Sequence, residues 1–362
     1  MLRLAPALLV VPLSLQAQDS TPPPPRRAPP GHWHIGLTYH DYGITIGNAA
    51  RTNGLRINFS DAGLERVNGI NLTIWAPREP VSGTVNGLAV GIAGPAADYL
   101  NGIAIGAGGV VAHRRARWLT IGGFGVVSND RLEGIALGGL GTVANGEIRG
   151  IAIAGLGAVS NGDVRGVAIA GLGAVANRDV QGIMIGGLGA VANGNLTGIG
   201  IGGLGAVANR DVKGLALSGL GTVANRDLTG VGIGGLATVA NGNTTGLSVG
   251  GLASVTNGSL TGVGIGGVAV VASREVRGLA LAGYRVDTRK LQGFSTALYL
   301  NTRELRGVSI GAYNRVRGLQ VGLTIGVYNS ARVLKGIQIG VLNRAQNNRG
   351  IFRMLPIINA HL

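Results

Sequence analysis

Glycine and aliphatic residues recur along most of this chain with a period of sixteen residues. If each periodic glycine is numbered 0, aliphatic residues occupy positions 1, 3, 6, 9 and 14 of the repeat, and asparagine occupies position 11. Positions 1, 3 and 6 become 9, 11 and 14 when eight is added, so each repeat has two similar halves. The periodic glycines of the unbroken part are Gly134, Gly150, Gly166, Gly182, Gly198, Gly214, Gly230, Gly246, Gly262 and Gly278.

Each half of the repeat predicts a short strand and a corner. A two-residue step keeps side chains on one side of a strand, and a three-residue step indicates that the chain turns. Two strands and two corners per sixteen residues predict an all-β protein, a flattened parallel β-solenoid in which residues i and i+16 are ladder neighbours. We expect the aliphatic side chains to point inward, in one coil those of Val167, Ile169, Leu172, Val175 and Val180.

An outer-membrane β-barrel is the alternative fold. Its strands need about ten residues of unbroken alternation, and its rims carry girdles of aromatic residues. Here the alternation slips at position 6, as at Leu172, and no aromatic residue recurs through the regular units. The pattern therefore favours the solenoid.

The asparagines at position 11 correspond to Ile169 in the other half of the repeat. We therefore predict an inward row in which stacked amides bond one another, because a buried amide needs partners. The alternative is a turn position, where asparagine is also favoured. The predicted ladder consists of Asn129, Asn145, Asn161, Asn177, Asn193, Asn209, Asn225, Asn241 and Asn257.

The regular repeats occupy residues 102–292. Irregular coils flank them at residues 32–101 and 293–362, where we expect caps over the ends of the core. Residues 1–17 combine a basic residue, an apolar stretch and a small residue before polar chain, which is typical of a secretory signal peptide. Residues 18–31 form a proline-rich linker. These features predict an exported protein.

Positive charge is concentrated near the C-terminus. The chain has a net charge of +15. Gly134–Arg277 holds eight basic and six acidic residues, whereas Gly278–Leu362 holds twelve basic and two acidic residues. This excess predicts an anionic partner such as lipopolysaccharide or phospholipid, and the alternative is a basic cap that prevents end-to-end stacking. The predicted anion contacts are Arg114, Arg115, Arg117, Arg315 and Arg317.

The sequence predicts no cofactor, no metal and no nucleic-acid partner. Stretches such as Gly198–Gly203 match a nucleotide-binding glycine pattern, but they lie within periodic strands without the helix that this site requires. No nucleic-acid-binding module is recognisable. His32, His34 and His40 are the candidates for a metal site, yet Asp41 is the one carboxylate beside them.

No enzymatic site is expected either. Acid–base chemistry needs acids and bases that converge on one exposed face. In the regular coils the positions predicted to face outward are Gly and Ala, as at Gly166 and Ala168. A carbohydrate-active β-helix enzyme is the less favoured alternative, because some parallel β-helices carry such activities.

Three C-terminal units, "GVSIGAYN", "GLTIGVYN" and "GIQIGVLN", begin at Gly307, Gly322 and Gly336. They resemble the Gly-Leu-Gln-Ile-Gly-Leu-x-Asn units of bacterial surface-repeat proteins of the Leptospira type, and the central "VAIAGLGAVAN" units are similar to coils in the heads of trimeric autotransporter adhesins. The first resemblance implies a Gram-negative protein of the periplasm, outer membrane or cell surface. We expect a structural or interaction module that binds an anionic envelope surface or another protein, or that self-associates.

Overall fold

The computed structural model describes residues 33–78 and 81–361 of the chain. The chain divides into two units, residues 1–31 and His32–Leu362, and the described residues belong to the second. The predicted signal peptide (1–17), the linker (18–31) and the metal candidate His32 lie outside the described residues.

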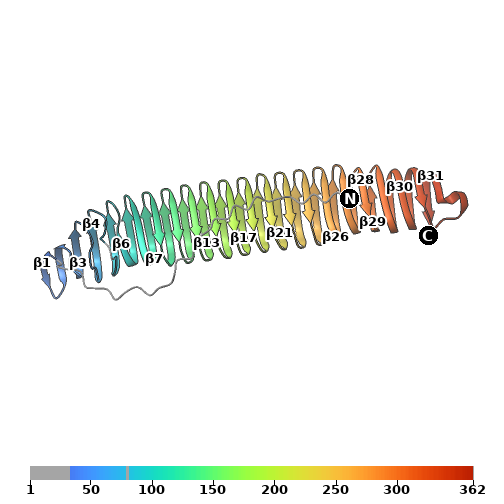
Figure 1. Ribbon diagram of the computed structural model, residues 1–362. Coiled ribbons are helices and arrows are strands. Elements are labelled where there is room, and N and C mark those ends of the chain that lie inside the picture. Colours follow the sequence, from blue (N-terminus) through green and yellow to red (C-terminus); the bar gives the residue numbers. More distant parts are fainter. Residues whose placement is uncertain (1–32, 79–80, 362) are drawn as a thin grey trace, which may run out of the picture. The chain divides into compact units, whose positions relative to one another are not determined.

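The described unit is an all-β parallel solenoid, as predicted. Successive coils stack along the chain (Figure 1), and each residue of the regular array pairs with the residue sixteen positions later, as Gly150 does with Gly166. Gly166 pairs in turn with Gly182. A membrane barrel joins antiparallel neighbours, so this parallel register shows that the barrel alternative is wrong.

Each regular coil contains one long and one short strand, and these form two facing sheets, the long-strand sheet and the short-strand sheet. The long strands are β9 (Arg131–Gly138), β11 (Ile148–Ala154), β13 (Val164–Ala170), β15 (Val180–Gly186), β17 (Leu196–Gly202), β19 (Val212–Ser218), β21 (Leu228–Gly234), β23 (Thr244–Gly250) and β25 (Leu260–Gly266). The short strands are β8 (Gly125–Ser128), β10 (Gly141–Ala144), β12 (Gly157–Ser160), β14 (Gly173–Ala176), β16 (Gly189–Ala192), β18 (Gly205–Ala208), β20 (Gly221–Ala224), β22 (Ala237–Ala240) and β24 (Ala253–Thr256).

Coils of other sizes flank this array. The N-terminal strands are β1 (His34–Tyr39), β2 (Tyr42–Gly47), β3 (Arg51–Asn58), β4 (Arg66–Thr73), β5 (Thr84–Gly91), β6 (Ala96–Gly106) and β7 (Gly109–Gly122). The C-terminal elements are β26 (Ala269–Ala282), β27 (Arg285–Thr296), β28 (Tyr299–Thr302), β29 (Glu304–Ile310), β30 (Tyr313–Ala345), the 3-10 helix η1 (Gly350–Arg353) and β31 (Met354–His361).

An antiparallel strand lies at each end of the described solenoid. β1 pairs with β2, and β31 pairs with β30, whereas the other strand pairings are parallel. β1 pairs only with β2 and is exposed along its whole length, so its outer edge has no strand partner among the described residues. Within the described residues, no helix is long and apolar enough to cross a membrane.

The interior holds the small side chains, so the predicted facing of the strands is wrong at most positions. Val167, Ile169 and Val175 are partly exposed, and Leu172 is 47% exposed. Only the prediction for position 14, as at Val180, is confirmed. The buried side chains of this coil are Ala168, Ala170, Ala174, Ala176 and Val180.

Close approach of the two sheets explains this facing. In β17, Leu196 and Gly200 both point inward, and a Cβ added at Gly200 would lie 2.6 Å from Leu196 Cδ2. The next coil places Val212 and Ala216 at the same two positions. In these two coils the larger residue at one position lies beside the smaller residue at the other, because interiors are packed to nearly constant density.

One coil of the regular array has hydroxyl groups at its inward positions. The hydroxyl groups of Thr244 and Thr256 lie 2.8 Å apart, and those of Ser248 and Ser254 lie 2.7 Å apart. The apolar core divides at this coil into one cluster that ends at Ala240 and a second cluster that begins at Leu260.

The backbone conformation of the periodic positions favours glycine, and Trp118 takes this position in one coil with a φ of +84°. Gly198 has a φ of +121°, and an added Cβ would lie 2.1 Å from the carbonyl oxygen of Gly182 in the preceding coil. Side chains other than hydrogen are disfavoured in this region of φ. This backbone conformation recurs once per coil, which explains the sixteen-residue period of glycine in the sequence.

The asparagines of the array form a ladder, but on the outside. Asn193 Nδ2 donates to Asn177 Oδ1 at 2.9 Å, and Asn209 Nδ2 donates to Asn193 Oδ1 at 2.8 Å. These side chains are exposed at the corner that follows each short strand. The predicted inward placement is therefore wrong. A buried asparagine ladder occurs instead in β30, where Asn329 Nδ2 donates to Asn343 Oδ1 at 2.8 Å.

Candidate anion-binding site

Of the three histidine candidates, the structure describes His34 and His40. His34 lies in the exposed strand β1, and His40 lies in the turn that follows it, edge-on to the ring of Tyr39. Among the described residues, no group of three His, Cys, Asp or Glu side chains could hold a metal ion.

Arg114, Arg115 and Arg117 lie together in β7, but an acid compensates two of them. Arg117 Nε lies 2.9 Å from Glu133 Oε2, and Arg115 Nη1 lies 3.7 Å from Glu133 Oε1. Arg114 and Arg115 also lie over the ring of Tyr99, at 5.9 and 5.7 Å from its centroid. Two of these three charges are therefore engaged within the protein.

A buried ion pair lies among the N-terminal coils. Arg56 points into the core, where its guanidinium contacts Asp61 and donates from Nη1 to Asn71 Oδ1 at 2.9 Å. The Arg56 Nε group donates to the carbonyl oxygen of Ala49 at 3.0 Å. Because the pair is closed off from solvent and satisfied within the protein, it is a structural feature of these coils.

The outward side chains of the short-strand sheet become more polar in the C-terminal coils. On the outer face of this sheet, Arg285 takes the ladder position of Ala269 in the next coil, and Tyr299 takes it in the coil after that. The neighbouring column changes from Val271 to Asp287 to Asn301 through the same pairings. Small and aliphatic side chains thus give way to long polar ones, and a hollow forms where the two kinds meet.

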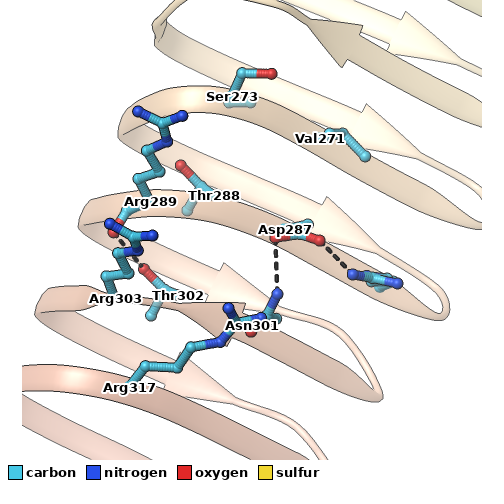
Figure 2. Close-up of a pocket in the computed structure, with 11 residues that line it drawn as sticks. Val271, Ser273, Asp287, Thr288, Arg289, Asn301, Thr302, Arg303 and Arg317 are labelled. Atoms are coloured by element: carbon cyan, nitrogen blue, oxygen red, sulfur yellow. Dashed lines mark hydrogen bonds and ion pairs between the residues drawn. The ribbon is translucent and has the colours of Figure 1, made fainter. Parts of the chain in front are cut away.

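That hollow is a groove of about 400 Å³ that opens to solvent. Figure 2 shows that Arg289, Arg303 and Arg317 come from three successive coils along it. Asp287 is already engaged, because it contacts Arg285 and accepts a hydrogen bond from Asn301 Nδ2 at 2.9 Å (Figure 2).

A second groove of about 510 Å³ continues from the first, and Arg317 lines both. The stacked rings of Tyr313 and Tyr328 line it, with their centroids 4.8 Å apart. Tyr299 extends the stack, with its centroid 5.3 Å from that of Tyr313. We call the two hollows together the arginine groove. Its basic residues are Arg285, Arg289, Arg303, Arg315, Arg317, Arg332 and Arg344.

Most of these arginines lack a carboxylate partner. Within residues 33–78 and 81–361, Arg285 alone of the seven forms an ion pair, with Asp287. The regular array differs, since Glu147 there lies 2.7 Å from Arg149 Nε and 3.3 Å from Arg131 Nε. Seven of the twelve basic residues of the C-terminal coils therefore lie in the arginine groove, and six of these seven have no carboxylate partner in the described part of the chain.

Arg277 and Lys290, which lie in β26 and β27 outside the groove, share one carboxylate. Glu275 Oε2 lies 2.9 Å from Arg277 Nη2, and Glu275 Oε1 lies 3.4 Å from Lys290 Nζ. Partial burial opposes ionisation of Glu275, but the hydrogen bonds and positive charges of Arg277 and Lys290 outweigh it and lower the pKa of this carboxyl. Arg277 and Lys290 thus share a carboxylate partner, which six of the seven groove arginines lack among the residues that the structure describes.

Of the predicted anion contacts, Arg315 and Arg317 lie in the arginine groove. Sequence reasoning missed Arg285, Arg289 and Arg303, although the last two precede Arg317 at a spacing of fourteen residues, the size of these coils. A row of guanidinium groups at the ladder spacing can bind a ligand with repeated anionic groups. No protein-family model matches the chain, and neither does any curated protein or solved structure.

Proposed function

We propose that this protein is an exported structural and interaction module of a Gram-negative envelope, and that its arginine groove holds an anionic envelope component. The solenoid would act as a rigid support that carries the groove. The signal-like N-terminal residues and the resemblance to surface-repeat units support the location, and the uncompensated arginines support the partner.

The observation that carries the proposal is the set of unpaired guanidinium groups. Arg289, Arg303 and Arg317 are exposed and lie on successive coils. Neighbouring strands are roughly 4.8 Å apart, and two like charges at such a distance repel by about 1 kcal/mol in water. A ligand with repeated negative groups relieves this repulsion and gains charge-assisted hydrogen bonds.

We propose binding without catalysis. Hydrolysis of a sugar polymer needs two carboxyl groups that flank the bond to be cleaved. Among the residues that line the arginine groove, Asp287 is the single carboxylate, and Arg285 and Asn301 engage it. This arrangement supports a holding role.

The test measures binding of the full chain to vesicles that contain anionic phospholipid and to vesicles that carry lipopolysaccharide. The variant Arg303→Gln/Arg317→Gln removes two charges from the groove, and the control Arg149→Gln/Arg165→Gln removes two charges that acids compensate. Each basic residue near an anionic surface contributes about 1 kcal/mol, so the groove variant should bind roughly thirtyfold more weakly. Binding should also fade as salt rises from about 50 to 500 mM.

Equal weakening by the groove and control variants would show that net charge alone drives binding, and would refute the assignment of the groove. Absence of binding by the unmodified chain at low salt would instead leave the basic end as a cap against end-to-end stacking. Release of a reducing sugar from bound lipopolysaccharide would contradict the proposal of binding without catalysis.

A further inference from the structure

The long-strand sheet carries two outward columns of apolar side chains along nearly the whole described solenoid. We call them the aliphatic stripe; its rows are positions 1 and 3 of each coil, as in Ile183 and Ile185. Ladder pairings join nineteen rows, from Ile44 and Ile46 to Leu323 and Ile325. Thr296 is the only polar member of these rows.

The stripe faces solvent. None of its members is buried, and Ile135 and Ile153, which neighbouring rows flank on both sides, are still 42% and 40% exposed. The strand positions between them, such as Ala136 and Ala152, point to the core and are buried. Soluble monomers rarely expose a contiguous apolar patch larger than a few hundred Å², so a surface of this kind is expected to be covered.

We propose that the aliphatic stripe is the interface between two copies of this chain, packed sheet against sheet in antiparallel orientation. The inference is independent of the proposed function, because the arginine groove lies on the short-strand sheet and stays open in such a pair.

The size of the stripe supports a second copy. Nineteen rows at roughly 4.8 Å give a length of roughly 90 Å, and two columns two residues apart give a width of roughly 10 Å with their side chains. Each copy therefore offers roughly 900 Å², close to the roughly 800 Å² per partner of a stable interface. The rows of a second copy have the same spacing, so they can interdigitate with the stripe along its whole length.

The distribution of charge decides the orientation. Gly278–Leu362 holds twelve basic and two acidic residues. A parallel pair would bring two such basic ends together, whereas an antiparallel pair places them at opposite ends of the dimer. A twofold axis through the middle of the stripe produces this arrangement, and such isologous pairs are the commonest oligomers.

The first test is the mass of the full chain in solution, measured by sedimentation at micromolar concentration. Ile169→Glu/Ile201→Glu places two charges in the stripe, and the control Val175→Glu/Val207→Glu places two charges at the same spacing on the short-strand sheet. We expect dimers of the unmodified chain and of the control, and at least tenfold weaker association of the stripe variant with an unchanged circular dichroism spectrum.

A second test does not depend on the folding of the charged variants. The chain has no cysteine, so single cysteines can be joined by a short bismaleimide. Ile185 lies in the central row, whereas Ile105 and Ile265 lie five rows to either side of it. Ile185→Cys should link to its own copy, and Ile105→Cys should link only to Ile265→Cys when the two variants are mixed.

Self-linking of Ile105→Cys would overturn the antiparallel orientation. A monomeric unmodified chain would overturn the interface. If that monomer bound neutral vesicles and Ile169→Glu/Ile201→Glu abolished this binding, lipid would be the occupant of the stripe, and the second copy would be excluded.

Discussion

The matched sizes of Leu196 and Gly200 make the packing of the thin core measurable. Gly200→Ala places a Cβ 2.6 Å from Leu196 Cδ2. Gly200 has no positive φ, so the backbone itself accepts alanine. Overpacking of a core costs about 1–3 kcal/mol, and loss of a glycine from the unfolded chain returns about 0.4–1 kcal/mol. The variant should therefore lose roughly 1–2 kcal/mol of the free energy of unfolding.

The next coil supplies the compensating change, because Val212 and Ala216 occupy the equivalent positions there. Leu196→Val alone removes one buried methylene and should cost about 1 kcal/mol. In the double variant Leu196→Val/Gly200→Ala the clash is relieved, so the two changes should be coupled by about 1–3 kcal/mol in favour of the double variant.

The assay is urea unfolding of the four proteins of this cycle, followed by circular dichroism. The control is Gly205→Ala, since a Cβ there would meet the nearest atom of its surroundings at 3.8 Å. It should leave the unfolding midpoint nearly unchanged. If the costs of the two single changes simply add, or if Gly200→Ala is more stable than the unmodified chain, the size-matching argument is wrong.

Further predictions concern the glycines, the ladders and one carboxyl group. Gly198→Ala should cost more than about 2 kcal/mol, because its Cβ would lie 2.1 Å from a carbonyl oxygen, whereas Gly189→Ala, with the nearest atom at 3.8 Å, should leave the melting temperature almost unchanged. Asn193→Ala should cost less than about 1 kcal/mol because the side chain is exposed, and Asn329→Ala should cost about 1–3 kcal/mol because it leaves buried polar groups unpaired; equal midpoints in urea would contradict this. In the folded protein the pKa of Glu275 lies below its ordinary value of 4.5, so the ionised carboxylate stabilises the fold. This contribution to the free energy of unfolding is fully present above pH 4.5 and is lost as the pH falls through the lowered pKa. In Glu275→Gln the free energy of unfolding should therefore decrease less as the pH is lowered. An unaltered pH profile of unfolding would contradict the ion-pair geometry.

The sequence was sufficient to predict the coil and its register. A glycine that needs a positive φ returns once per coil, so the spacing between Gly150 and Gly166 directly gives the ladder pairing. That the irregular end coils act as caps stays a prediction, which rests on the two open edges that a stack of strands leaves.

The facing of the strands could not be obtained in the same way. A two-residue period defines two faces but does not say which one is buried. We assigned Ile169 to the interior because large apolar residues are usually buried, but the inward side of this strand carries Val164, Ala168 and Ala170. The pair Gly200 and Leu196 could have indicated which face is buried, since a small residue beside a large one on the same face indicates a tight contact across the core.

The arginine groove was predicted only in part. The basic excess of the C-terminal coils located the region, and Arg315 and Arg317 do lie in the groove. Arg289 and Arg303 were missed because their relation to Arg317 depends on a coil of fourteen residues, and the regular array has coils of sixteen. The compensation of Arg117 by Glu133 became visible only with the ladder register, in which these residues are neighbours.

The polar coil between Thr244 and Thr256 has a consequence for cooperativity. In a linear array each coil contacts mainly its two neighbours, so the stability of the whole array depends on the contacts between successive coils. The hydroxyl bonds join residues within this coil, so they do not replace the apolar contacts that link successive coils on either side of it. The solenoid should therefore unfold as two blocks that part near Ser248, and hydrogen exchange should show separate opening energies for the strands before β23 and after it. The C-terminal block, which holds the arginine groove, can then keep its structure while the other block opens.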